Sequence, residues 1–279
     1  TVIFVLMSLG CYRNDEAAIL TKSTVWFAGF NQFQPNFLQM LGESLAGCFL
    51  FGTNNYNGVL WTIPYLFSGA LVVYLAAYLV GENPFRYVVY LVMLLAAVKT
   101  DIYFAGIFLG FAASDFFCTR QKGMELWRRF WLLPLGSFVL GVYLLSYPSI
   151  GSDMSGTIYG ILPSVYTTLY HLAGAALLLA GVLGLPGLQR FFGAKPFRFL
   201  GKVSYSLYLL HFPVIATFSC WLFLSLYGKM SYGLLTALDF VCTLALVLIL
   251  SALSRKYLEP VSGRLTAGIS KTFAGRKKE

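Results

Sequence analysis

Long apolar runs separated by short polar connections make up most of the chain. The eight runs are Val2–Tyr12, Trp61–Val80, Tyr87–Val98, Ile102–Cys118, Phe130–Tyr147, Ser164–Leu185, Val203–Tyr227 and Gly233–Leu253. A helix that crosses a membrane needs about 20 mostly apolar residues, because the hydrocarbon core is about 30 Å thick and an α-helix rises about 1.5 Å per residue. The pattern therefore predicts an all-α fold, a polytopic transmembrane helical bundle with about eight spans.

Two of the runs have special features. Val2–Tyr12 is too short to span and has no basic residues ahead of it, so it resembles the second half of a helix rather than a signal peptide. We therefore expect the sequence to be truncated at its N-terminus. The runs Tyr87–Val98 and Ile102–Cys118 are separated by only three residues, which predicts a tight helical hairpin.

The long connection Arg13–Leu60 is rich in Asn, Gln, Phe and Gly. It is either a lid over a site or an ordinary external loop, since loops both connect helices and carry function. Within it, Phe37–Gly52 mixes apolar and polar residues and contains Glu43. This mixture predicts an interfacial or re-entrant helix rather than a span.

The composition supports a membrane protein. Hydrophobic residues make up 58% of the 279 residues and charged residues only 11%, whereas soluble domains carry about 25% charged residues. No polar stretch is long enough for a separate soluble domain, so residues 1–279 are interpreted as a single membrane domain whose first spans are missing. The lipid bilayer is its first expected partner.

Basic residues alternate between the two sides of the predicted bundle. Sixteen of the 20 Lys and Arg residues lie in four connections, Gly81–Arg86, Thr119–Arg129, Pro186–Lys202 and the tail from Ser254. The other connections hold four. Because cytoplasmic loops carry an excess of Lys and Arg, this predicts a cytoplasmic C-terminus with a basic tail over 254–279. The net charge of +9 then reflects membrane orientation, and no nucleic-acid partner is expected.

Several common types of site are absent from the sequence. The five cysteines form an odd set without paired spacing and are interpreted as buried apolar side chains, so no disulfide or metal site is expected. Nucleotide-binding, metalloprotease and serine-hydrolase motifs do not occur. Gly106 and Gly110 form a G-x-x-x-G pair, which predicts close helix packing within the bundle.

Ionisable residues inside predicted spans are candidates for function, because they are costly in lipid. His211 lies eight residues from the cytoplasmic edge of its run, about 12 Å deep at 1.5 Å per residue. Ser204 and Tyr208 lie on the same helix face. Pro213 leaves the Leu209 carbonyl without its usual donor, which predicts a kink or a bound water. His211 is either a general base toward a hydroxyl or a structural residue that joins helices.

His171 and Asp239 lie at matching depths, each seven residues from the external end of its run. A lone carboxylate at this depth is costly, so we expect the two side chains to pair. The pair is either part of a site or a structural ion pair. On the cytoplasmic side, Arg190, Lys195, Arg198 and Lys202 precede the His211 helix. These basic residues either bind phosphates of an acyl donor or are there only because cytoplasmic loops are rich in Lys and Arg.

The segment Phe199–Val214 resembles the signature of the acyltransferase-three family of integral membrane O-acyltransferases, which reads approximately L-G-x-I-S-Y-x-x-Y-L-x-H-x-P. The matching residues are Leu200, Gly201, Ser204, Tyr205, Tyr208, Leu209, His211 and Pro213. Asn57–Thr62 is similar to the family's N-x-x-L-W-[ST] motif, Phe108–Asp115 to the G-x-x-x-[AS]-D end of its F-x-x-G-x-x-x-[AS]-D motif, and Arg255–Pro260 loosely to its last motif. The resemblance covers nearly the whole chain.

The resemblance implies a bundle of about ten spans that transfers an acyl group, often acetyl, from acyl-CoA to a hydroxyl of a sugar, lipid or small metabolite. We assign His211 as the catalytic residue of this chain, and Arg198 and Lys202 to the phosphates of acyl-CoA, which is a donor substrate rather than a bound cofactor. The residues assigned to substrate binding are Ser204, Tyr205, Tyr208, Trp61, His171 and Asp239.

Two departures from the family pattern favour a rival hypothesis. The family's first spans carry an Arg and a His thought to be essential, and this chain begins after them. The family also usually has a Glu five residues after the Trp of its L-W motif, where this chain has Leu66. The rival is a non-catalytic relative that acts as a lipid or solute transporter or as a binding scaffold. The sequence indicates neither an organelle nor an oligomeric state.

Overall fold

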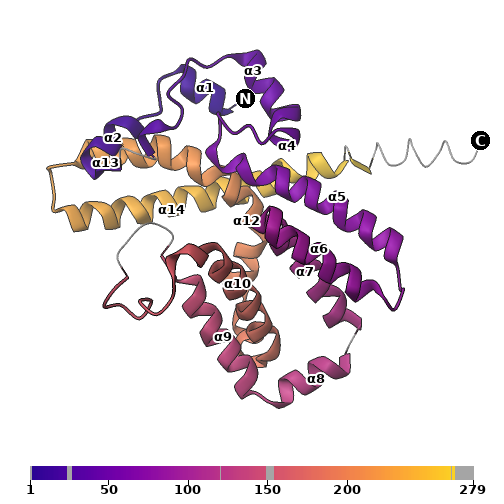
Figure 1. Ribbon diagram of the computed structural model, residues 1–279. Coiled ribbons are helices and arrows are strands. Elements are labelled where there is room, and N and C mark those ends of the chain that lie inside the picture. Colours follow the sequence, from indigo (N-terminus) through magenta and orange to yellow (C-terminus); the bar gives the residue numbers. More distant parts are fainter. Residues whose placement is uncertain (1, 24–26, 120, 149–153, 265, 268–279) are drawn as a thin grey trace, which may run out of the picture. The chain divides into compact units, whose positions relative to one another are not determined.

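The computed structural model describes residues 2–23, 27–119, 121–148, 154–264 and 266–267 (Figure 1). Within these ranges the regular secondary structure is entirely helical, so the all-α class is confirmed. Contacts divide the chain into two compact units. Unit 1 comprises Thr1–Pro64 and Pro196–Glu279, and unit 2 comprises Tyr65–Lys195. The predicted single domain over 1–279 stays a prediction.

Unit 2 is built from paired helices. Its elements are α5 (Ile63–Val80, whose first two residues belong to unit 1), α6 (Arg86–Thr100), α7 (Ile102–Thr119), α8 (Gln121–Arg129), α9 (Leu132–Leu145), η4 (Ser164–Tyr166), α10 (Thr167–Gly184) and α11 (Pro186–Phe192). The hairpin of α6 and α7 is confirmed. Asp101 is the extended residue between them, and its Oδ1 accepts a hydrogen bond of 3.0 Å from the Tyr103 amide. This side-chain cap stabilises the start of α7.

Unit 1 combines the first segments of the chain with its last helices. The first part contains α1 (Val2–Ser8), α2 (Asn14–Thr21), η1 (Phe27–Gly29), α3 (Phe37–Gly42), η2 (Glu43–Gly47), α4 (Cys48–Leu50) and η3 (Gly58–Thr62). The second part contains α12 (Lys195–Val214), η5 (Ile215–Ser219), α13 (Cys220–Leu226) and α14 (Tyr232–Tyr257). η2 and η5 are π-helical turns, whereas η1, η3 and η4 are 3₁₀ turns.

Five helices in the described part are long and apolar enough to cross a membrane: Gly58–Val80, Ile102–Thr119, Ser164–Gly184, Lys195–Leu226 and Tyr232–Arg264. The pair α8–α9 is a sixth candidate, with an 86° bend between its halves. The predicted number of about eight is not reached, because α1 has 7 residues and α6 has 15. Fifteen helical residues extend over about 22 Å, which is less than the hydrocarbon thickness of about 30 Å.

Glycines bring the backbones of α9 and α10 into close contact. A Cβ atom at Gly141 would lie 2.5 Å from the Leu178 nitrogen, and one at Gly181 would lie 2.7 Å from the Cα atom of Phe138. Ser137, in the same interface, donates a hydrogen bond of 2.9 Å to the Leu177 carbonyl. Small residues and hydroxyl groups of this kind hold helices together in lipid, where apolar surface alone does not favour association.

Within unit 2, Gly106 and Gly110 do not show the predicted close packing. A Cβ atom at Gly106 would make an ordinary contact of 3.5 Å with Leu172, and one at Gly110 would meet nothing within 4 Å. A G-x-x-x-G spacing puts two glycines on one face, but whether another backbone approaches that face depends on the partner helix. In unit 2 the close contact forms on α9 and α10 instead.

The amphipathic helix α8 is fastened to the end of α10. The Trp127 indole nitrogen donates to the Ala180 carbonyl at 3.0 Å, and Arg128 Nε donates to the Leu183 carbonyl at 3.3 Å. The Leu183 carbonyl lies in the last turn of α10, where carbonyls lack helical partners. The two contacts hold α8 against α10 on one side of the 86° bend between α8 and α9.

Hydrogen bonds order much of the predicted external connection Arg13–Leu60. The buried side-chain amide of Asn14 donates to the carbonyls of Phe27 and Phe30. The backbone N–H of Arg13 donates to the Ala216 carbonyl in η5. At the surface, a hydrogen bond from Arg13 holds the pKa of the Glu16 carboxyl below its ordinary value. The segment Phe37–Leu50 is helical and too short to be a candidate span, as predicted, although a π turn interrupts it; its interfacial or re-entrant position stays a prediction.

Candidate functional site

Pro213 determines the local shape of α12, the helix that carries the sequence signature. It lies inside the helix and has no N–H group to donate to the Leu209 carbonyl. Asn57, which is 4% exposed, supplies the missing donor: its Nδ2 lies 2.9 Å from the Leu209 oxygen. Pro213 thus leaves the Leu209 carbonyl without its helical donor, as predicted. The side chain of Asn57, 152 residues away in sequence, takes the place of that donor.

The helix loosens after Pro213. The Thr217 hydroxyl donates a hydrogen bond of 2.7 Å to the Pro213 carbonyl, and residues Ile215–Ser219 form the π turn η5. A hydroxyl that bonds four residues back competes with the backbone ladder and often bends a helix. The predicted kink therefore takes the form of a widened turn, a feature frequent at functional sites.

Tyr208 fastens α12 to the segment before α5. Its hydroxyl donates to the Val59 carbonyl at 2.6 Å and lies 2.8 Å from the Thr62 hydroxyl, which can then donate to it. These contacts and the one from Asn57 join the motif Asn57–Thr62 to the signature on α12. Trp61, in the same 3₁₀ turn, is 42% exposed. Its assignment to substrate binding stays a prediction.

A cavity of about 330 Å³ lies between the α12–η5 segment and α14, and His211 and Asp239 both line it. The wall on the first segment is formed by Leu207, His211, Ile215 and Ser219, and the α14 wall includes Thr236, Asp239 and Thr243. The Asp239 carboxylate accepts hydrogen bonds from Ser219 at 2.7 Å and from Thr243 at 3.3 Å. Two of the predicted site residues therefore share one mostly apolar cavity.

The hydrogen bond of His211 selects one tautomer of its ring. Nδ1 lies 3.3 Å from the Leu207 carbonyl oxygen, which can only accept, so Nδ1 carries the proton. Nε2 then holds the lone pair, and no hydrogen-bond partner for it occurs among the described residues. A neutral imidazole with a free Nε2 beside a cavity has the arrangement of a general base.

Ser204 and Tyr205, the other predicted residues of α12, are exposed. The Ser204 hydroxyl donates to the Gly201 carbonyl within the helix, at 3.0 Å, and Tyr205 is 59% exposed. Neither lines the His211 cavity. On the polar face predicted from Ser204 through His211, therefore, only Tyr208 contacts another segment and only His211 lines the cavity. The roles assigned to Ser204 and Tyr205 stay predictions.

His171 and Asp239 each have a partner inside their own unit. The Nε2 atom of His171, on α10, donates to the Tyr147 carbonyl at 2.8 Å. Asp239 accepts from Ser219 and Thr243. The predicted pairing would join the two units and stays a prediction, as does the assignment of His171 to substrate binding. Within unit 2, its contact fastens α10 to the residue that follows α9.

The cytoplasmic end of α12, in the predicted orientation, carries a polar cluster that the sequence analysis missed. The buried Ser206 hydroxyl lies 3.0 Å from both the Ser254 hydroxyl and a Glu259 carboxylate oxygen. Arg255 donates to the Lys202 carbonyl. The cluster joins the signature to the last motif, Arg255–Pro260. The sign of this cluster in the sequence was Ser206, a polar residue on a different helix face from Ser204 and Tyr208.

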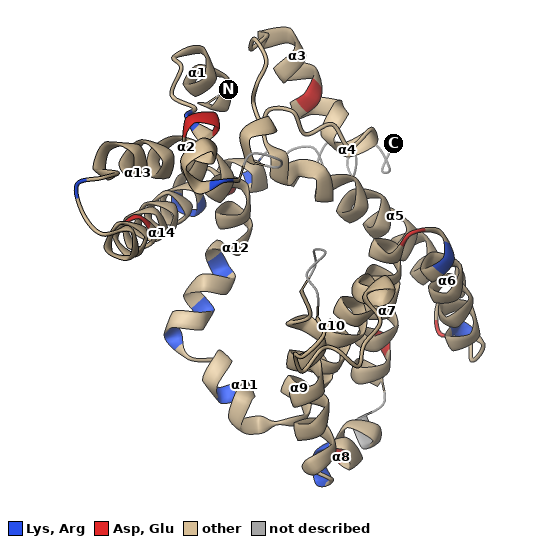
Figure 2. Cartoon of the chain, turned by 60° about the vertical axis from the view of Figure 1, so that its left-hand side comes forward, with Lys and Arg blue, Asp and Glu red and all other residues tan. Residues whose placement is uncertain are grey.

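Basic residues recur along the first half of α12 (Figure 2). Arg198 and Lys202 are exposed and four residues apart, hence on one face of the helix. Arg190 lies on α11, in unit 2. Of the predicted basic tail over 254–279, residues 265 and 268–279 lie outside the described part of the chain.

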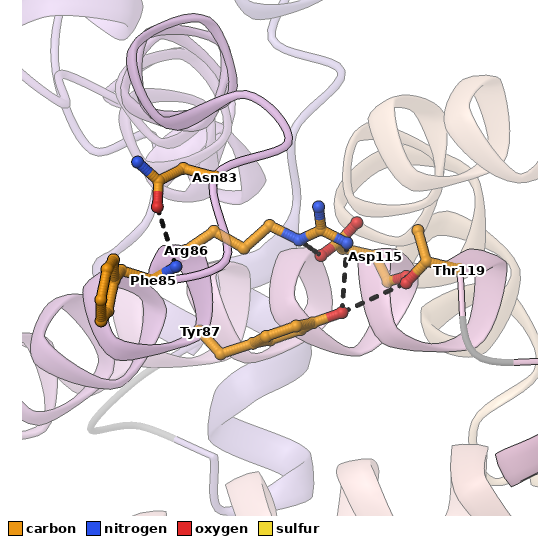
Figure 3. Close-up of polar contacts among 6 residues, drawn as sticks. All are labelled: Asn83, Phe85, Arg86, Tyr87, Asp115 and Thr119. Atoms are coloured by element: carbon orange, nitrogen blue, oxygen red, sulfur yellow. Dashed lines mark hydrogen bonds and ion pairs between the residues drawn. The ribbon is translucent and has the colours of Figure 1, made fainter.

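Asp115 forms an ion pair that the sequence analysis also missed (Figure 3). Its carboxylate lies 2.8 Å from Arg86 Nε, and the two side chains are 19% and 14% exposed. Arg86 also donates to the Tyr87 hydroxyl at 3.3 Å, which lies 3.2 Å from the Thr119 hydroxyl. The group joins the start of α6 to the end of α7 within unit 2.

Two further features bear on chemistry. Leu66, at the position where the family usually has Glu, is 56% exposed on α5. The described residues contain no group of three or more His, Cys, Asp or Glu side chains that could hold a metal ion.

Comparisons with known proteins agree with the sequence motifs. A family model described as an acyltransferase domain matches residues 3–256. No curated protein and no solved structure matches the chain.

Proposed function

The chain belongs to the acyltransferase-three family, and from this premise we propose that it is a membrane-bound O-acyltransferase that moves an acyl group, in the first instance acetyl, from acyl-CoA to a hydroxyl of a sugar, lipid or small metabolite. Membership of this family and the five or six candidate spans together indicate an integral multi-pass membrane protein of an acyltransferase family. The donor, the acceptor and the cytoplasmic C-terminus are parts of the proposal.

The observation that carries the proposal is the His211 ring, with Nδ1–H bonded to the Leu207 carbonyl and Nε2 free beside the cavity. In the proposed reaction, Nε2 accepts the proton of the acceptor hydroxyl while that oxygen attacks the thioester carbonyl. The new carbon–oxygen bond forms and the carbon–sulfur bond breaks. The thiolate of CoA leaves and takes the proton from His211, which restores the neutral ring.

Polar groups of the same cavity suit the acceptor. Asp239 accepts two hydrogen bonds, and an ionised carboxylate has room for about four, so it can also receive a hydroxyl of a polyol or sugar. Tyr208 and Thr62 then act through position: they hold α12 beside the segment before α5. We assign the exposed Arg198 and Lys202 to the phosphates of CoA, because both are basic and unburied.

A second candidate rests on one observation. Leu66 replaces the usual Glu and carries no ionisable group. If that carboxylate is required for transfer, the chain is a non-catalytic relative that binds or moves a lipid or solute through the same cavities.

The test follows radiolabel from acetyl-CoA into hydroxyl-bearing extracts, with the protein reconstituted in lipid nanodiscs. We expect transfer by the wild type and a fall of about 100-fold or more in His211→Ala and His211→Gln, since a general base contributes about 10²–10⁴-fold. Trp221→Phe is the control, because Trp221 lies on α13, is 53% exposed and does not line the His211 cavity.

The unfolding temperature of each variant separates loss of chemistry from loss of fold. Undiminished transfer by folded His211→Gln would remove His211 from the mechanism. No transfer by the folded wild type with acetyl-CoA or longer acyl-CoA donors would overturn the proposal and favour the non-catalytic relative.

A further inference from the structure

A second cavity of about 480 Å³ lies in unit 1 and shares no lining residue with the His211 cavity. Its α12 wall includes Leu209 and Pro213, and its other walls come from α1, α3, η2, the segment before α5, and α14. The volume is within the range of ligand sites, about 300–1,000 Å³. Most of the lining is aliphatic, so the cavity suits an apolar body.

One end of this cavity holds a buried carboxylate. Glu43, the first residue of the π turn η2, is 6% exposed. One oxygen accepts from the Asn55 Nδ2 at 2.9 Å, and the other accepts from the Tyr56 amide at 3.0 Å. Both donors are neutral, and in the part of the chain that the structure describes no Lys, Arg or His forms an ion pair with Glu43. Buried carboxylates normally have a cationic or metal partner.

The neighbouring polar atoms also lack donors. A carboxylate has about four acceptor sites, and Glu43 uses two. Asn57 also lines the cavity; its Nδ2 is committed to the Leu209 carbonyl, while its buried Oδ1 has no partner. Unsatisfied buried acceptors of this kind are costly and call for an explanation such as a bound group. A ligand here must bring donors.

We propose that this cavity is a second ligand site that binds an amphiphilic primary amine, with its ammonium group on Glu43 and its alkyl body against the aliphatic walls. An ammonium group supplies three donors and the positive charge that the Glu43 surroundings lack. A fatty alcohol would supply one donor and no charge, and a carboxylate or phosphate would be repelled. The site is separate from the His211 cavity, because no residue lines both cavities.

The test uses a 12-carbon primary amine that carries a photoreactive diazirine in its chain, and the alcohol of identical chain as its match. The protein is held in phosphatidylcholine nanodiscs at pH 7, where an alkylamine is protonated. After irradiation, mass spectrometry measures label on peptides that contain Met40 and Leu246, which lie on different walls of the cavity. We expect the amine to label both, and excess unlabelled dodecylamine to suppress this.

Three variants make the test specific. Glu43→Gln keeps an acceptor for Asn55 or Tyr56 and removes the charge, so amine labelling should fall about tenfold or more, while alcohol labelling stays unchanged. Leu246→Trp fills the apolar part without touching the hydrogen bonds of Glu43, so amine labelling should also fall. Val241→Trp, at a residue 61% exposed on the same helix, should change nothing.

The proposal is overturned if amine and alcohol label the cavity equally, or if folded Glu43→Gln retains full amine labelling. Should Glu43→Gln fail to fold, Leu246→Trp decides: undiminished amine labelling in that variant shows that the amine does not enter the cavity.

Discussion

Removing the Asn57 side chain should destabilise unit 1 through the carbonyl that Pro213 leaves without a donor. In Asn57→Ala the partly buried Leu209 oxygen loses the hydrogen bond of 2.9 Å from Asn57 Nδ2. An unsatisfied buried acceptor costs about 1–3 kcal/mol. Hydrogen bonds between helices in membranes are worth about 0.6 kcal/mol on average, and about 1.7 at most. We therefore expect the free energy of unfolding to fall by about 1–2 kcal/mol.

A double-mutant cycle isolates the cause. Pro213→Ala supplies the N–H that a regular helix directs at the Leu209 carbonyl, so Asn57→Ala should cost about 1 kcal/mol less in that background. The free energy of unfolding is measured by denaturant titration in mixed micelles for the wild type, both single variants and the double variant.

Asn54→Ala is the matched control, because Asn54 Nδ2 also donates to a backbone carbonyl of unit 1, that of Gly58, at 3.0 Å. It should show no coupling to Pro213→Ala. A coupling between Asn57 and Pro213 of less than about 0.3 kcal/mol, the range in which independent sites add, would refute the reasoning.

Three further predictions concern packing and charge. Gly141→Ala should lower the free energy of unfolding by about 1–3 kcal/mol, because the new Cβ meets the Leu178 backbone, whereas Gly110→Ala should not lower it; equal losses in thermal unfolding would contradict this. Asp115→Leu should lower the free energy of unfolding by removing the ion-pair partner of Arg86, and adding Arg86→Met should recover most of the loss in the same titration. Ser206→Ala should speed proteolysis of the C-terminal segment by freeing Glu259, whereas Ser204→Ala, whose hydroxyl bonds only within α12, should not.

The sequence predicted features that depend on one segment. The all-α class and the α6–α7 hairpin follow from apolar runs and their spacing, because a helix in lipid must satisfy its own backbone. The vacancy at the Leu209 carbonyl also followed, since it depends on Pro213 alone. The number of spans did not, because the short runs Val2–Tyr12 and Tyr87–Val98 were counted as spans, whereas α1 has 7 residues and α6 has 15.

Contacts between segments far apart in the sequence could not be predicted. Asn57 is 152 residues from Leu209, and nothing in either segment indicates the pairing. Arg86 was counted as a loop cation, so its ion pair with Asp115 was missed. A signal did exist for the close contact of α9 and α10: Gly174 and Gly181 are seven residues apart, on one face of a helix, and both meet α9.

The π turn Ile215–Ser219 determines the direction in which the residues after it face around the helix axis. The residues of α12 and η5 that line the His211 cavity recur every four positions, at 207, 211, 215 and 219. In a regular α-helix each such step overshoots a full turn by about 40°, so Ser219 would swing progressively away from His211. A π turn holds more residues than an α turn, and this corrects the drift. Deleting one residue here would rotate everything beyond it by about 100°, which makes the length of this segment, rather than its composition, the property that the chain must preserve.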